Sequence, residues 1–284
     1  MLTKKQFDVL SFLVENTDSV VADGETLKEC EALGFADGFK VTEKGLEALE
    51  PYRVKRAVFM AAGFGSRMVP ITLNTPKPLV RVNGVRMIDT LLDAVLAAGI
   101  EEIYIVRGYL GEQFDQLLYK YPMVKFIENP LYNKGNNVVS LNFAGELLRN
   151  AYVLESDLIL SNPKLITKYQ YESNYLTIPT EHTDDWRFTL DEEGYIDSVG
   201  IGGDDCYQII GISYWTDEYG ARFARDIAEV CKTPEGMKSF MSYVPLVYHK
   251  GEYKIRVREC RFEDVVEIDS FKELCEIDPA YKVE

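Results

Sequence analysis

The spacing of apolar side chains predicts two parts in the chain, which meet near residue 50. Within residues 1–50 the apolar positions recur at helical intervals. Thr3 is placed to cap a first helix, and a second, shorter helix is predicted over residues 25–33, ending at Gly34. The first helix would present one apolar face, made by Phe7, Leu10, Phe12, Leu13 and Val14. We therefore predict a small, mainly helical N-terminal domain over residues 1–50.

From residue 51 onward, short apolar runs alternate with stretches of helical periodicity. Runs of strand length occupy residues 57–62, 103–106, 124–127 and 152–154, and helical patterns cover residues 87–98, 111–119 and 136–148. Such alternation is typical of a parallel, doubly wound sheet, in which binding sites lie at the carboxyl ends of the strands. We predict that residues 51–284 form one α/β domain built on such a sheet.

The pattern changes after about residue 175, where antiparallel pairing is favoured. Residues 186–190 and 195–199 flank Asp191-Glu192-Glu193-Gly194, which is a good hairpin signal. The further predicted elements are a strand over 206–214, helices over 218–231 and 238–248, strands near 254–257 and 265–268, and a closing helix from Phe271. The predicted fold class is therefore α/β, doubly wound, with a mixed and mainly parallel sheet.

A glycine-containing loop follows the first strand of this domain. Gly63 and Gly65 allow positive φ angles and let backbone N–H groups approach a bound group closely. Arg67 and Lys77 then supply two cations, one suited to bidentate contacts and one acting as a point charge. This arrangement suits an anionic phosphate chain. The loop is not a Walker A motif, because no Gly-Lys-Ser/Thr follows, and it lacks the third glycine of the dinucleotide fingerprint.

The longer string around this loop resembles the signature of a known family. It reads Ala61-Ala62-Gly63-Phe64-Gly65-Ser66-Arg67, and nine residues separate Arg67 from the lysine of Pro76-Lys77-Pro78. The string resembles the signature of the sugar-phosphate and choline-phosphate nucleotidyltransferases, and is most similar to that of the bacterial phosphocholine cytidylyltransferases. The resemblance covers roughly residues 56–275. It implies a Rossmann-like nucleotidyltransferase fold and transfer of a nucleotide from CTP with release of pyrophosphate.

The resemblance also implies roles for residues around the nucleotide. Arg67 is expected to bind the β- and γ-phosphates, and Lys77 to lie nearer the α-phosphate, so these two are the predicted catalytic residues. Both reactants are anionic, so the protein must mainly align them and neutralise charge, and no protein nucleophile is required. The implied nucleotide-binding residues are Ala61, Ala62, Gly63, Gly65, Ser66, Gly108, Tyr109 and Asn136.

Acidic side chains after two of the predicted strands are candidates for a metal site. Mg²⁺ prefers hard oxygen ligands, typically one or two carboxylates together with substrate phosphates. Asp157 follows an apolar strand, and Asp269 belongs to the late segment Glu267-Ile268-Asp269. The family uses a strand-end Asp and a late Glu-x-Asp in this way. The resemblance therefore implies Mg²⁺ held by Asp157 and Asp269, with Glu267 as a further candidate ligand.

An aromatic region indicates the second substrate. A quaternary ammonium is bound by aromatic faces and a nearby carboxylate, and Asp185-Trp186 resembles a segment of the phosphocholine enzymes. Asp185, Trp186 and Tyr214, which lies on a later similar strand, are the predicted acceptor-binding residues. Relatives carry an aromatic-Trp-acid cluster on a late helix, where this chain has Phe240-Met241-Ser242. An incomplete aromatic cage would leave room for a smaller, primary ammonium.

The predicted function is Mg²⁺-dependent transfer of CMP from CTP to phosphocholine, giving CDP-choline and pyrophosphate. Three alternatives stay open from the sequence. The first is 2-aminoethylphosphonate as the acceptor, and the second is a sugar 1-phosphate. The third, from a different class, is a nucleotide-sensing transcriptional regulator that has kept a nucleotidyltransferase fold.

Charge and composition limit the partners. The formal net charge is −15, and residues 1–50 contain five basic against eleven acidic side chains, which disfavours nucleic-acid binding. Residues 41–49 loosely resemble the wing and last helix of winged-helix domains. We expect residues 1–50 to be a structural or dimerising appendage rather than an operator-binding module, with a sensing role left open.

The sequence also predicts a cellular setting. Its five cysteines are scattered and without Cys-x-x-Cys spacing, as expected for free thiols in a reducing compartment. No apolar run approaches the roughly 20 residues of a membrane span, and the start of the chain does not read as a secretory signal. We therefore expect a cytoplasmic protein without a membrane partner, with a homodimer left open.

Overall fold

The computed structural model describes residues 1–16 and 23–282. Contacts divide the chain into two compact units. The first comprises Met1–Val54 together with the short segment Lys168–Tyr171, and the second comprises Lys55–Thr167 and Glu172–Glu284. The first unit is therefore built from two stretches of chain that are distant in sequence, which the pattern of apolar positions did not predict.

The first unit is mainly helical. Thr3 caps its first helix with a full capping box, accepting from the Gln6 N–H while the Gln6 side chain accepts from the Thr3 N–H. The buried face of this helix includes Val9, whereas Phe12, predicted to lie on that face, is exposed. The elements of the unit are α1 (Lys4–Glu15), α2 (Gly24–Ala32), β1 (Ala36–Asp37), β2 (Lys40–Val41) and α3 (Glu43–Leu49), with β1 and β2 antiparallel.

Aromatic side chains tie the distant segment into this unit. The ring of Tyr171 stacks on that of Tyr52, with centroids 5.3 Å apart and planes 8° from parallel. Phe7 on α1 packs against both rings, and the Tyr171 hydroxyl donates a hydrogen bond to the Leu2 carbonyl at 3.3 Å. The segment Lys168–Tyr171 thus completes the core of the first unit. Its winged-helix identity stays a prediction.

The second unit is built on a seven-stranded sheet in the order β12-β10-β11-β8-β3-β6-β7. The parallel half contains β3 (Arg56–Ala61), β6 (Glu102–Arg107), β7 (Lys125–Glu128) and β8 (Ala151–Glu155). The other half contains the long antiparallel pair β10 (Asn174–Leu190) and β11 (Ile196–Trp215), with β12 (Arg256–Glu259) parallel to β10. The mixed, mainly parallel α/β sheet predicted from the sequence is confirmed.

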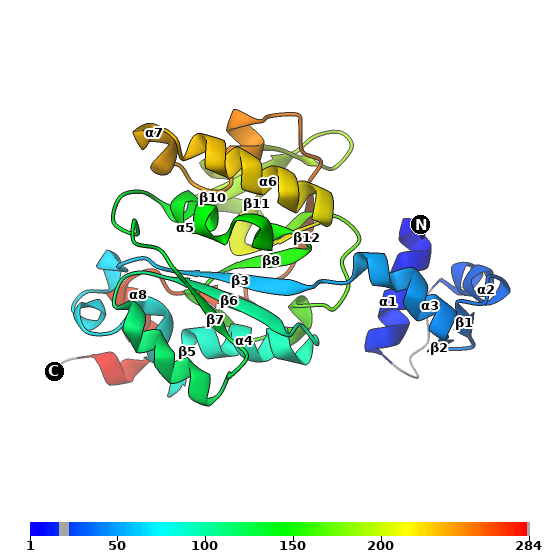
Figure 1. Cartoon of the computed structure of the whole chain (residues 1–284), viewed down its shortest axis with the longest axis horizontal. Helices are drawn as coiled ribbons and strands as arrows, with labels where there is room; N and C mark the ends of the chain where they lie inside the picture. The colour runs from blue at the N-terminus through cyan, green and yellow to red at the C-terminus, as the bar shows by residue number, and fades with distance from the viewer. Residues whose placement is uncertain (17–22, 283–284) are drawn as a thin grey trace. The chain divides into compact units, whose positions relative to one another are not determined.

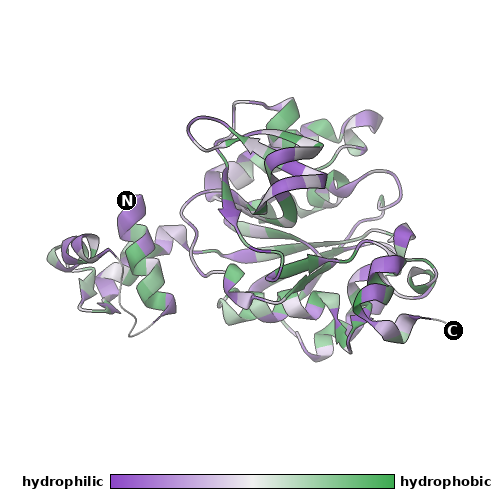
Figure 2. Ribbon diagram, turned by 180° about the vertical axis from the view of Figure 1, so that it is seen from behind, coloured by the Kyte–Doolittle hydropathy of each residue, from purple (hydrophilic) through white to green (hydrophobic). Residues whose placement is uncertain are grey.

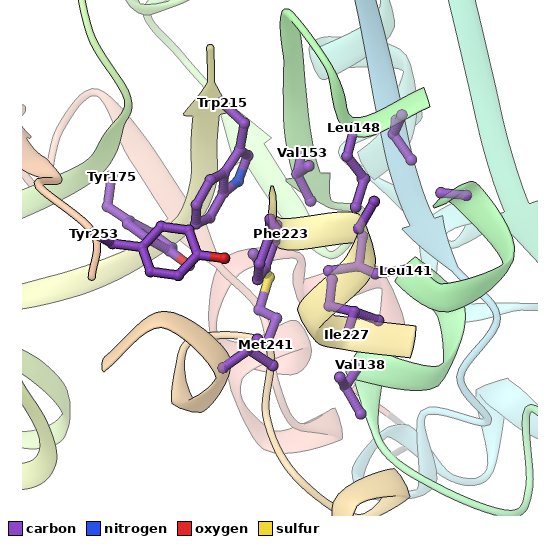
Figure 3. Packing of buried hydrophobic residues seen from close by; sticks show 14 of the residues in the cluster. Val138, Leu141, Leu148, Val153, Tyr175, Trp215, Phe223, Ile227, Met241 and Tyr253 are labelled. Atoms are coloured by element: carbon purple, nitrogen blue, oxygen red, sulfur yellow. The ribbon is translucent and has the colours of Figure 1, made fainter. Parts of the chain in front are cut away.

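Helices cover both faces of this sheet. Figure 1 shows α4 (Met87–Ala97) on one face and α5 (Asn137–Ala144) and α6 (Asp217–Val230) on the other. The strands between them are largely hydrophobic, as Figure 2 shows. On the α5–α6 side the core includes a stacked pair, Trp215 and Phe223, with ring centroids 3.9 Å apart (Figure 3). Such burial of large aromatic and aliphatic side chains is the main source of fold stability.

Smaller elements complete the second unit. They are the antiparallel pair β4 (Arg81–Val82) and β5 (Val85–Arg86), the pair β9 (Leu158–Leu160) and β13 (Val265–Glu267), the short helix α7 (Pro234–Met237), and α8 (Phe271–Ile277). Within the described residues, no helix is long and apolar enough to cross a membrane.

One predicted helix, over residues 238–248, is wrong. The chain there forms turns and then a π-helical turn over Val244–Tyr248. Pro245 explains part of the difference, because proline has no N–H to donate to a regular helix and clashes with the preceding turn. Part of the irregular stretch before it, residues 240–242, lines the cavity described next instead of packing as a regular helix.

Candidate active site

The glycine loop after β3 is packed against the lysine that follows it. Gly65 has φ +67°, and a Cβ atom there would lie 3.0 Å from Cβ of Lys77 and 3.1 Å from Cγ2 of Thr72. Only glycine combines that backbone conformation with so close an approach. The Thr72 hydroxyl also donates to the Gly65 carbonyl at 2.9 Å. Close packing against Gly65 thereby helps to fix the position of the Lys77 side chain.

Lys77 lies between two of the predicted metal ligands. Its Nζ atom is 2.7 Å from Oδ2 of Asp157 and 2.9 Å from Oδ1 of Asp269, and the residue is only 7% exposed. Burial lowers the pKa of Lys77, but the Asp157 and Asp269 carboxylates outweigh it and leave the pKa raised, so the side chain stays protonated. Arg67 contacts the same Asp269 oxygen at 2.9 Å and is itself largely exposed.

Three carboxylates lie close together beside this ion-pair network. Oxygen atoms of Glu155, Asp157 and Glu267 all lie within 4.8 Å of one another. The arrangement follows from the fold, because β8 ends at Glu155 and the pairing of β13 with β9 places Glu267 opposite Leu158. We refer to Glu155, Asp157 and Glu267 as the carboxylate cluster.

The cluster has the properties of a cation site. Burial and then the Asp157 charge raise the pKa of Glu267 to about 9, and the same two causes raise the pKa of Glu155 to about 7. Oδ1 of Asp157 is buried and has no hydrogen-bond partner in the described chain. Buried carboxylates need a neighbouring positive charge, and Mg²⁺ prefers carboxylate oxygens as ligands. The residues present therefore fit that ion.

Trp186 and Phe240 line another side of the same cavity, and the ring of Tyr243 packs against both. The ring of Trp186 on β10 lies 4.8 Å from that of Phe240 and 5.9 Å from that of Tyr243, and the last two are 6.2 Å apart. We call Trp186, Phe240 and Tyr243 the aromatic wall. Asp185 precedes Trp186, and its carboxylate accepts a hydrogen bond from the Trp186 N–H at 2.7 Å.

A cavity of about 480 Å³ in the second unit brings most of the predicted site residues together. It is the size of a site for a small ligand. Those that line it are Ala61, Ala62, Gly63, Gly65, Ser66, Arg67, Lys77, Asn136, Asp157, Asp185, Trp186, Glu267 and Asp269. Nucleotide, metal and acceptor candidates, which span more than 200 positions of sequence, therefore share one cavity.

Three predicted site residues lie elsewhere among the described residues. Gly108 packs against the side chain of Tyr132, and the Tyr109 hydroxyl donates a hydrogen bond to the Thr72 carbonyl at 2.9 Å. Neither residue lines the cavity. Tyr214 is 1% exposed and packs against Tyr152, with ring centroids 5.7 Å apart. The structure places Tyr214 in the core because its side chain points into the packed side of β11, and this corrects its predicted contact with the acceptor.

Sequence reasoning missed two residues that line the cavity, Glu155 and Asn137, and one that packs against its aromatic side chains, Tyr243. Glu155 lies two positions before Asp157, and alternation along an extended chain puts positions i and i+2 on one face, so the spacing carried the signal. Tyr243 follows Phe240 by three residues, which a turn brings together. Asn137, whose amide donates to the Glu155 carboxylate at 3.1 Å, gave no signal distinct from that of Asn136, the helix cap.

Known proteins share this combination of fold and site. Residues 56–183 match the Nucleotidyl transferase family. The 2-aminoethylphosphonate cytidylyltransferase of Lancefieldella rimae is 36% identical over 228 residues, which cover 79% of this chain and 92% of that protein. The choline-phosphate cytidylyltransferase of Streptococcus pneumoniae is 28% identical over 230 residues, covering 81% of this chain and 99% of that protein.

A solved structure agrees with these sequence matches. The CTP:phosphocholine cytidylyltransferase of Streptococcus pneumoniae superposes with a TM-score of 0.72 and 29% identity, covering 81% of this chain and 100% of that one. The chain belongs to the nucleotidyl transferase family and is a nucleotidyltransferase. The two relatives described above, from Lancefieldella rimae and Streptococcus pneumoniae, are cytidylyltransferases. About a fifth of this chain lies outside each of these matches.

Proposed function

We propose that this nucleotidyltransferase transfers CMP from CTP to a small phosphonate or phosphate that carries an amine, and that 2-aminoethylphosphonate is its acceptor. The relative that acts on 2-aminoethylphosphonate is more similar in sequence than the relative from Streptococcus pneumoniae that acts on choline phosphate. This reverses the order of the two acceptors expected from the sequence alone. The observation that carries the proposal is the shared cavity, with Lys77 and its carboxylates together with the aromatic wall.

The loop side of the cavity suits a nucleoside triphosphate. Backbone N–H groups of residues 63–66 and the exposed guanidinium of Arg67 are available to the β- and γ-phosphates. Lys77 is buried, charged and held in place by Asp157 and Asp269, so it supplies a fixed positive charge near the α-phosphate. A preorganised charge of this kind stabilises a transition state without a cost of reorganisation.

The reaction then follows from alignment and charge. An oxygen of the acceptor's phosphonate attacks the α-phosphorus of CTP, a new P–O–P linkage forms, and the bond from the α-phosphorus to the bridging oxygen breaks to release pyrophosphate. Mg²⁺ would neutralise phosphate charge when bound. Asp157 would be its first ligand, and the further ligands would come from Glu155, Glu267 and Asp269. Lys77 and Arg67 stabilise the negative charge that develops on the transferred group and on the leaving pyrophosphate. No side chain has to act as a nucleophile.

The opposite side of the cavity suits a small cation. The aromatic faces of Trp186 and Phe240 attract a positive charge, and the Asp185 carboxylate lies in the same lining. A primary ammonium would add hydrogen bonds to a carboxylate, which a trimethylammonium group cannot donate. Phosphocholine remains the second candidate acceptor, because three aromatic rings gathered at one wall also favour a quaternary ammonium.

Pyrophosphate release provides the test. The full-length protein with Mg²⁺ is assayed with CTP, UTP, ATP and GTP, each combined with 2-aminoethylphosphonate, phosphoethanolamine, phosphocholine or glucose 1-phosphate. We expect CTP with 2-aminoethylphosphonate to give the highest kcat/KM. Lys77→Ala should lower kcat about 100-fold or more, because a buried charge at the reacting phosphate is lost. Preference for glucose 1-phosphate, or no turnover with any amine, would refute the proposal.

A further inference from the structure

The start of α5 joins two parts of the cavity that are far apart in sequence. The amide oxygen of Asn137 accepts a hydrogen bond from the Met241 N–H at 2.8 Å, and its amide nitrogen donates to the Glu155 carboxylate at 3.1 Å. All three residues line the cavity. One side chain therefore bridges the segment that carries Phe240 and the strand end that begins the carboxylate cluster.

The backbone contacts around this bridge are equally close. The Asn136 N–H donates to the Met237 carbonyl at 2.7 Å, and a Cβ atom on Gly135 would lie 2.2 Å from the same carbonyl oxygen. Residues 135–137 thus dock against residues 237–241. Because residues 238–242 form neither a regular helix nor a strand, their position depends on such contacts rather than on a continuous hydrogen-bond ladder.

Helix capping does not account for the Asn137 side chain. The cap of α5 is Asn136, whose side-chain oxygen already accepts from the Asn137 N–H at 2.8 Å. Both polar atoms of the Asn137 side chain are used outside its own helix. Met241 anchors the far end of the bridge, since its side chain is buried in the core beside Phe223 (Figure 3).

We infer that Asn137 is a positioning residue that fixes the aromatic wall relative to the carboxylate cluster. The bond to the Met241 backbone sets the place of the adjacent Phe240, whose ring packs 4.8 Å from that of Trp186. The bond to Glu155 orients that carboxylate from the same point. This role rests on the proposed function, since it concerns how the amine end of the acceptor is held relative to its reacting phosphonate.

The two bonds use different atoms, so two variants separate them. Asn137→Asp keeps the oxygen that accepts from Met241 and replaces the group that donates to Glu155, whereas Asn137→Ala removes both. We expect Asn137→Ala to raise the KM for 2-aminoethylphosphonate about 10-fold while the KM for CTP changes less than about 3-fold. Asn137→Asp should keep the acceptor KM near that of the wild type and lower kcat, because two carboxylates would then face each other.

A matched control measures the cost of losing a buried asparagine alone. Asn129 is 2% exposed, donates to the Ser140 hydroxyl at 3.1 Å and accepts from the Leu131 N–H at 2.9 Å, without a bond to the aromatic wall or the carboxylate cluster. Asn129→Ala should lower the melting temperature and leave the acceptor KM unchanged. If Asn137→Ala does not fold, Asn137→Ser makes the same comparison, because its shorter side chain spans neither bond.

Tryptophan fluorescence tests the inference without turnover. The chain has two tryptophans, and Trp215 is fully buried, so changes in acrylamide quenching report on Trp186. Asn137→Ala should increase that quenching, and Asn137→Asp and Asn129→Ala should not. Equal effects of the Ala and Asp variants on acceptor KM, or unchanged quenching in Asn137→Ala, would overturn the inference. Absence of turnover in the wild type would refute the proposed function while leaving the quenching result to decide the role of Asn137.

Discussion

At the scale of single residues, the site brings together more carboxyl groups than cationic ones. Within the described part of the chain, Lys77 contacts Asp157 and Asp269, Arg67 contacts Asp269, and two further carboxyl groups, Glu155 and Glu267, lie beside Asp157. Burial first, and then the negative charge of neighbouring carboxylates, raises the pKa of Glu155 and of Glu267, so each carboxyl favours its protonated form unless a further cation is bound. Keeping these carboxyl groups ionised in the folded protein therefore has an electrostatic cost, which a bound cation would offset.

This cost predicts a pH dependence of stability. Glu267 has an ordinary pKa of 4.5 and a folded-state pKa of about 9, so the folded protein holds a proton that the unfolded chain releases. The contribution of this group to the free energy of unfolding is therefore complete below about pH 4.5 and is lost as the pH rises toward 9. Glu267→Gln cannot titrate. Without metal, its stability relative to the wild type should increase between pH 5 and pH 9.

Chemical denaturation in EDTA at several pH values measures this difference. The matched control is Glu263→Gln, a change at a side chain that is 74% exposed, and its difference from the wild type should not vary with pH. Stability curves of Glu267→Gln and the wild type that run parallel from pH 5 to pH 9 would contradict the interpretation.

At the scale of elements, the loop after β3 is the part of the site that depends most strictly on its sequence. Gly65→Ala places a side chain at φ +67° and within 3.1 Å of both Lys77 and Thr72. Left-handed backbone at a non-glycine residue costs about 1–3 kcal/mol, so we expect a loss of stability of this size. Gly63→Ala is the control, because a Cβ atom there meets nothing within 4 Å and its φ is not positive.

The denaturation midpoints of the two variants decide this prediction. Only Gly65→Ala should shift the midpoint, and it should also lower kcat because the added methyl group displaces Lys77. Equal midpoints in the two alanine variants would show that neither the backbone conformation nor the close approach to Lys77 constrains this loop.

The sequence predicted the elements whose signals are local. Apolar runs marked β3, β6 and β8, and the loop string marked Lys77, because strand periodicity and glycine spacing can be read within a few residues. It could not place Asn137 beside Met241, or Trp186 beside Phe240, because those contacts depend on how irregular segments pack. The predicted contact of Tyr214 with the acceptor was wrong for a related reason. Its strand was correctly predicted, but the sequence did not show which face of that strand Tyr214 lies on.

At the scale of the whole molecule, the two units differ in what the sequence revealed. The mixed, mainly parallel sheet of the second unit was correctly predicted because alternating strands and helices have few alternative arrangements. The first unit depends on Lys168–Tyr171, a segment more than a hundred residues beyond its helices. Nothing in the polar and apolar pattern distinguishes Tyr171 from an ordinary loop tyrosine.

The role of Tyr171 can be measured directly. Tyr171→Ala removes its ring contacts with Tyr52 and Phe7 and its hydrogen bond to the Leu2 carbonyl. We expect the first unit to lose about 2 kcal/mol, somewhat less than for a fully buried aromatic residue. Amide hydrogen exchange in α1 and α3 should accelerate accordingly. Tyr119→Ala, at a side chain that is 97% exposed, is the control and should leave that exchange unchanged.

The discontinuous first unit also has a consequence for synthesis on the ribosome. Its helices α1, α2 and α3 are translated before β3, α4, β6 and β8, whereas Tyr171, the stacking partner of Tyr52, is translated after them. Domains usually fold in the order in which they are made, whereas this one cannot close its core until Tyr171 has left the exit tunnel. The first unit is thus completed only after β3, β6, β7 and β8 of the catalytic sheet have been synthesised.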